Sequence, residues 1–195
     1  MAKTRNLKPD GARLEDWIEP MTLRGRWGRV DSSNKSFVDR GTVEDIAPAF
    51  AAEFSMVLEN VREGADPPDV LARLDGRDVG IELVEFLNET VREREAMKLP
   101  ITFEDRLWSK EATIAKLNAL LDKKNALYAR RPDGFAADIL VIHSCEMWLN
   151  KADVETWVSQ VTFEPRSAIR AAYFALERLP DSPKPHWPLF RLYGP

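Results

Sequence analysis

Apolar residues recur at helical spacing from residue 42 to residue 63. Thr42 is a suitable N-cap, because two carboxylates follow it in the first turn. Pro48 then falls within the first turns, where a missing backbone N–H is tolerated. Gly64 and the ADPP segment after it end this predicted helix. The apolar positions that share its face are Ile46, Phe50, Phe54, Val57, Leu58 and Val61.

Two apolar runs follow, over residues 70–74 and 79–86, and Asp75-Gly76 lies between them. An Asp-Gly dipeptide in this position favours a two-residue type I′ turn, so the segment is predicted to form a β-hairpin. Both runs are apolar at successive positions, which is typical of strands buried on both faces. We therefore expect the hairpin to lie inside a sheet that helices cover.

The rest of the chain predicts further helices and strands. Residues 109–131 form a helical pattern that Pro132 and the following Asp-Gly end, and its inward face holds Ile114, Leu117, Leu121, Lys124 and Tyr128. The remaining predictions are a buried strand over 137–144, helices over 151–160 and 165–179, and a short strand over 189–193 after a Pro-rich link. Together these elements predict a mixed α/β fold with a central sheet of about four strands flanked by helices.

Residues 1–41 show no sustained period and are predicted to form an arm of loops before a single domain over residues 42–195. No apolar run approaches the roughly 18 to 20 residues of a membrane span. The first residues also lack the apolar core of a secretory signal, so we expect a cytoplasmic protein that does not enter membranes. Cys145 is the single cysteine, which excludes an internal disulfide and a Cys-rich zinc site.

Charged residues are unevenly distributed, although the net charge is only −4. Residues 1–40 hold nine Lys and Arg against six Asp and Glu, and residues 92–131 hold ten against six. Residues 41–91 hold three against twelve. An acidic middle between two basic segments would suit carboxylates beside a phosphate-binding surface, although solvated faces produce such runs more often.

Asp69 directly precedes the first run and Glu82 lies within the second, and at both positions an apolar residue would suit a buried strand better. If Asp75-Gly76 is the turn, directly opposed residues have numbers that sum to 151, and Asp69 opposes Glu82. If the turn is Gly76-Arg77 instead, the two acids are diagonal neighbours. Because side chains alternate along a strand, both turns leave the acids on one face.

Two carboxylates on one buried face repel each other and are costly to desolvate unless a cation lies between them. Oxygen ligands from Asp and Glu suit Mg²⁺ or Mn²⁺, which commonly retain waters and bind substrate phosphates. A metal so placed could assist hydrolysis of a phosphodiester. Asp69 and Glu82 are therefore the candidate metal ligands.

An acidic helix, then PPD before a strand, then a turn and VGIELVEF resembles the PD-(D/E)XK nuclease superfamily. The resemblance covers about residues 42–145 and implies a restriction-endonuclease-like fold. It also implies that Asp69 and Glu82 bind Mg²⁺ in a nuclease acting on nucleic acid, DNA or RNA.

That family has a Lys two residues after the Glu, whereas this chain has Val84. The resemblance is closest to branches in which a Lys from the next helix reaches the same space, and the candidates are Lys116, Lys123 and Lys124. Lys124 is preferred because its helix face is apolar. The family also often takes an acid from the helix before the sheet. Glu53 is the candidate for this role, since it lies on the apolar face of the predicted helix.

The leading hypothesis is metal-dependent phosphodiester hydrolysis, with basic residues of the N-terminal arm contacting backbone phosphates. The alternative is a catalytically inactive nuclease-fold protein that binds nucleic acid or a protein partner, and a homodimer is left open. A third class is an unrelated α/β enzyme that uses Cys145 and His143.

Overall fold

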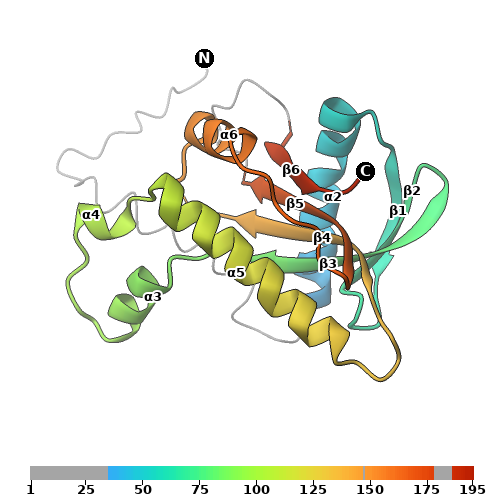
Figure 1. Ribbon diagram of the computed structural model, residues 1–195, viewed down its shortest axis with the longest axis horizontal. Coiled ribbons are helices and arrows are strands. Elements are labelled where there is room, and N and C mark those ends of the chain that lie inside the picture. The colour runs from blue at the N-terminus through green and yellow to red at the C-terminus, as the bar shows by residue number, and fades with distance from the viewer. Residues whose placement is uncertain (1–34, 147, 178–185) are drawn as a thin grey trace, which may run out of the picture.

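The computed structural model describes residues 35–146, 148–177 and 186–195, and these ranges form a six-stranded mixed sheet with helices on both faces (Figure 1). The strands lie in chain order, with β3 parallel to β4, β4 parallel to β5, and the other neighbours antiparallel. Their bounds are β1 Leu58–Glu63, β2 Val70–Leu74, β3 Arg77–Glu85, β4 Ala137–Ser144, β5 Ile169–Leu176 and β6 Leu189–Tyr193. The α/β class is confirmed, and the sheet has two strands more than expected.

Helices cover the two faces of the sheet and enclose two apolar cores. Helix α2 (Lys35–Phe54) covers one face, where its Phe50 packs edge-on against Tyr173 of β5 at 4.9 Å between ring centroids. Helices α5 (Lys110–Ala129) and α6 (Lys151–Ser159) cover the other face. The connection from β3 to α5 carries two short helices, α3 (Glu89–Ala96) and α4 (Phe103–Arg106). No helix in the described ranges is long and apolar enough to cross a membrane.

The predicted hairpin is confirmed, with its register. Leu74 pairs with Arg77 and Val70 pairs with Ile81, so opposed residues sum to 151. Asp75 and Gly76 both have positive φ, 48° and 80°, as a type I′ turn requires.

The helix predicted over residues 42–63 is wrong at both ends. Residues 35–41, predicted as part of the arm, are already helical, so Pro48 lies in the helix interior. Thr42 is not a cap, since its hydroxyl donates to the Val38 carbonyl oxygen at 2.9 Å. The helix ends at Phe54, Ser55 adopts a left-handed φ of 57°, and the chain returns as β1. β1 forms because it pairs with β2 in an antiparallel ladder. The spacing of apolar residues within one segment does not indicate whether such a partner strand exists.

The helix predicted over residues 165–179 is also wrong, because residues 169–176 form β5. This strand lies between β4 and β6 and is buried at every position except Arg170. Its alanines favour a helix by local propensity. They also fit a strand that is packed on both faces, where pairing with two neighbours outweighs that preference.

The other predicted elements are present: α5, β4, α6 and β6 all lie within the ranges expected for them. Most of the predicted N-terminal arm, residues 1–34, lies outside the described residues, as does most of the Pro-rich link.

Candidate functional site

Asp69 is held directly before β2 by a tight loop and by the neighbouring strand. The loop is closed by the Gly64 N–H, which donates to the Asp69 carbonyl oxygen at 3.0 Å, and by the Asp66 N–H, which donates to the Pro68 carbonyl at 3.1 Å. The Leu83 N–H of β3 donates to Asp69 Oδ2 at 2.9 Å. This bond holds the Asp69 carboxylate at β3, next to Glu82, and Asp69 is only 7% exposed.

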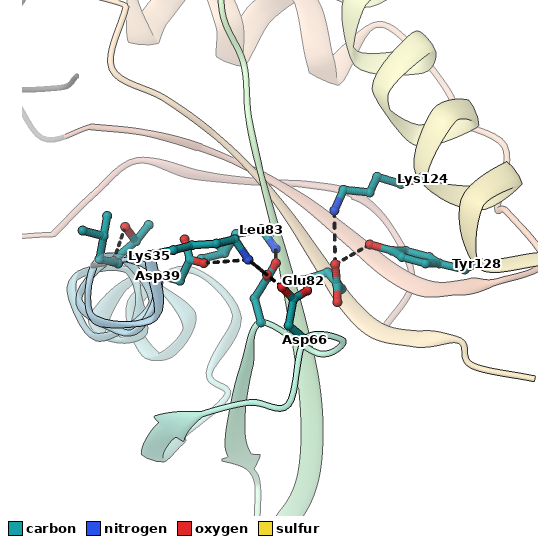
Figure 2. Close-up of polar contacts among 10 residues, drawn as sticks. Lys35, Asp39, Asp66, Glu82, Leu83, Lys124 and Tyr128 are labelled. Carbon is teal, nitrogen blue, oxygen red and sulfur yellow. Dashed lines mark hydrogen bonds and ion pairs between the residues drawn. The ribbon is translucent and has the colours of Figure 1, made fainter. Parts of the chain in front are cut away.

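Glu82 lies within β3 and is 3% exposed. Its neighbours Ile81 and Leu83 pack on the α2 side, so strand alternation directs Glu82 to the α5 side. There, Lys124 Nζ donates to Glu82 Oε2 at 3.1 Å, and the Tyr128 hydroxyl donates to the same oxygen (Figure 2). Lys124 and Tyr128 are four residues apart on α5 and therefore share a face.

Glu82 Oε1, in contrast, is buried and accepts no hydrogen bond from the described residues. Burial raises the pKa of the Glu82 carboxyl, and the nearby charge of Asp69 raises it further. The hydrogen bonds from Tyr128 and Lys124 lower this pKa without offsetting the rise. Burial and the bond to Glu82 raise the pKa of Tyr128, so its hydroxyl stays protonated and serves as a donor. One oxygen of Glu82 is thus fixed, and the other lacks a polar partner that a buried carboxylate oxygen would ordinarily have.

A second cation reaches the site from the α2 side, opposite to α5 (Figure 2). The ammonium of Lys35 contacts Asp69 Oδ1 and lies 3.3 Å from Asp39 Oδ2 and 3.5 Å from Asp66 Oδ2. Partial burial acts to lower the pKa of Lys35, but the hydrogen bond to Asp69 and the three carboxylate charges raise it above its usual range. Asp69 and Glu82 therefore each contact a lysine, one from each side of the sheet.

Of the predicted lysines, only Lys124 contacts one of the two acids, Glu82. Lys116 lies eight residues earlier on α5, about 12 Å along the axis, and its ammonium pairs with Glu89 at 2.7 Å. Lys123 is exposed. Val84, where the family motif has its Lys, packs against the apolar core on the α5 side.

Glu53 is also not brought to the acids. It lies 18 residues beyond Lys35 on α2, which places it about 27 Å along the helix axis. Its carboxylate lies 3.7 Å from His186 Nε2. The acid that α2 does supply is Asp39, which is 5% exposed and pairs with Lys35.

Sequence reasoning missed Lys35 and Asp39 because it began the helix at Thr42. Their i, i+4 spacing was the available signal, since it is typical of an ion pair on a helix. Tyr128 was placed on the correct helix face but was given no role. Asp66 was counted only as part of a helix stop.

The described residues offer few protein ligands for a metal near Asp69 and Glu82. The described residues contain no group of three or more His, Cys, Asp and Glu side chains arranged for a metal. Asp69 and Glu82 provide two carboxylates, one with a buried oxygen that has no hydrogen-bond partner among the described residues. Mg²⁺ is commonly bound by one or two carboxylates, with waters and substrate phosphates completing its shell, so it would need no protein ligands beyond these two acids.

His143, which the third class uses, lies on the opposite side of the sheet from Glu82. His143, on β4, follows Ile142, which packs on the α5 side. Strand alternation therefore directs His143 to the α2 side, away from the face that carries Glu82.

The raised pKa of Glu82 predicts a specific pH dependence in metal-free protein. A carboxyl whose pKa is raised by folding contributes stability below its ordinary value of 4.5, and this contribution is lost as the pH rises through the folded-state pKa. We expect the free energy of unfolding of the native protein to fall, relative to Glu82→Gln, as the pH rises from 4.5 toward neutral. Urea unfolding of both proteins in EDTA measures this difference. A difference that stays constant over this range would contradict the prediction.

Comparison with known proteins finds no relative of this chain. No family model matches the sequence, and no curated protein and no solved structure matches it.

Proposed function

We propose that this protein hydrolyses phosphodiester bonds of nucleic acid with the help of Mg²⁺ or Mn²⁺. The observation that carries the proposal is the buried and unpartnered Oε1 of Glu82, whose other oxygen binds Lys124 and whose neighbour Leu83 binds Asp69. A buried carboxylate oxygen without a donor is costly unless something else binds it. A divalent cation shared with Asp69 would remove that cost.

Each residue has a distinct role in the proposed chemistry. When bound, the metal would activate water and neutralise charge on the phosphate. Asp69 and Glu82 would hold it, and Tyr128 is a positioning residue that fixes Glu82 Oε2. Lys124 donates one N–H to Glu82, which leaves two of its three ammonium protons for a phosphate oxygen or the attacking water.

The restriction-endonuclease-like fold is part of the same proposal. In support, α2 precedes the hairpin that carries both acids, and α5, the long helix after the hairpin, supplies the lysine. Phosphate contacts from basic residues of the N-terminal arm concern residues outside those described, and they stay a prediction.

The test is cleavage of plasmid DNA, single-stranded DNA and RNA by the full chain, in Mg²⁺ or Mn²⁺ and in EDTA. Cleavage is expected only with metal. Asp69→Ala is expected to lower the rate about a thousandfold, since metal-assisted charge stabilisation supplies several kcal/mol. Lys110→Gln is the control, because the ammonium of Lys110 bonds to Gln160 and not to the site. Undiminished cleavage by Asp69→Ala would remove this residue from the mechanism.

One observation favours an inactive binding protein as the second candidate. In this arrangement both oxygens of Asp69 already have donors, Lys35 and the Leu83 N–H. Binding of the same nucleic acids without cleavage in either metal would support this candidate over the enzyme.

A further inference from the structure

Lys35 has an unusual set of partners for a lysine that is about half exposed. Its ammonium contacts Asp69 Oδ1 and lies within 3.5 Å of carboxylate oxygens of Asp39 and Asp66. These acids come from α2 and from the loop before β2, so the ammonium joins two separate parts of the chain. An ammonium has three protons, and three carboxylates surround this one.

The two lysines of the site therefore differ in what they can do. Lys124 donates to a single carboxylate and keeps protons for a substrate. Lys35 donates to Asp69 and forms ion pairs with two further carboxylates, so three acids already balance its single charge. Its charge acts on the acids themselves, and chiefly on Asp69, the proposed metal ligand.

We propose that Lys35 is a tethered cation that competes with the divalent metal for Asp69. This inference rests on the proposed function, since it assigns a role to Lys35 at the same site. A metal bound at Asp69 Oδ1 would lie within a few ångströms of the ammonium, and like charges at this distance repel each other. Metal binding then requires the Lys35 side chain to leave Asp69.

The geometry allows such an exchange. The Lys35 side chain is half exposed, whereas that of Asp69 is nearly buried, so the lysine can turn toward solvent while the acid stays in place. Asp69 is held independently of Lys35 by the Leu83 N–H. In the metal-free protein the ammonium offsets the charge of the acids, and it is released when a divalent cation takes over this role.

The test is Mn²⁺ binding by titration calorimetry, with no substrate present. Lys35→Gln and Lys35→Ala are each expected to bind Mn²⁺ about tenfold more tightly than the native protein, because the competing charge is gone. Lys35→Arg keeps the charge and is expected to bind as the native protein does. Lys110→Gln is the matched control, since it removes the same charge away from the site. Circular dichroism establishes that each variant is folded, and the two neutral variants serve as replicates of one another.

The outcomes separate this inference from the proposed function. Equal Mn²⁺ affinity in the native protein and both neutral variants overturns the role of Lys35. If Mn²⁺ binding in these three proteins still depends on Asp69, the proposed function stands. Loss of cleavage in Lys35→Gln with unchanged Mn²⁺ affinity also overturns it, because Lys35 would then act on the substrate. Absence of Mn²⁺ binding in every protein removes both the inference and the proposed metal.

Discussion

Glu82→Gln is expected to lower metal-dependent cleavage by about a thousandfold or more, while the protein stays folded. The amide keeps the size of the side chain and can still accept from Tyr128, but it lacks the charge that a divalent cation needs. A loss of this size corresponds to about 4 kcal/mol of transition-state stabilisation. Because the pKa of Glu82 is raised by burial, replacing it with a neutral group is not expected to weaken the fold at neutral pH.

The measurement is the cleavage rate under single-turnover conditions, with folding checked by urea unfolding. Asp78→Asn is the matched control, because Asp78 is an exposed acid on the same strand. Among the described residues its ion pairs are long, 3.8 Å to Arg62 and 3.7 Å to Arg73. Its rate is expected to equal that of the native protein. Cleavage by Glu82→Gln within tenfold of the native rate would contradict the assignment of Glu82 as a metal ligand.

Gly64→Ala is expected to destabilise the protein by about 3 kcal/mol, at the upper end of what overpacking costs. A Cβ at Gly64 would lie 1.8 Å from the Pro68 carbonyl oxygen and 2.9 Å from the Asp69 carbonyl carbon. Both are backbone atoms, so no side-chain rotation relieves the clash. The loop must shift, and Asp69 shifts with it. A displacement of about 1 Å can reduce a rate about a hundredfold, so cleavage is expected to fall as well.

Gly41→Ala provides the control for this change. A Cβ at Gly41 has nothing within 4 Å, and Gly41 lies inside α2. Alanine is favoured over glycine in a helix by up to about 1 kcal/mol, so this variant is expected to be equally stable or more stable. Urea midpoints and cleavage rates of both variants give the comparison. A Gly64→Ala protein with native stability would show that the loop does not need the close approach seen at Pro68.

The hairpin and the relation of its two acids could be predicted because short-range rules decide them. Asp75-Gly76 specifies a type I′ turn, the turn specifies the register, and in this register Asp69 reaches Leu83, the residue next to Glu82. The same holds for α5, whose period of apolar residues includes Lys124 and Tyr128.

The missed elements are those whose conformation depends on distant partners. Residues 58–63 continue a helical pattern, yet they form β1 because β2 is available to pair with them. Residues 169–176 read as a helix by propensity and form β5 because β4 and β6 flank them. Because the predicted helix began at Thr42, it did not include Lys35 and Asp39. The acid predicted from this helix was therefore Glu53, at its far end.

By itself, then, the sequence determined the hairpin, its register and the closeness of its two acids, since turn chemistry and strand pairing act within about twenty residues. Only the tertiary structure decided which cations meet them. Lys124 is selected over Lys116 and Lys123 by how α5 lies across the sheet, and Lys35 reaches Asp69 because α2 packs on the opposite face. These contacts join residues 42 and 34 positions apart, and packing of whole elements decides them.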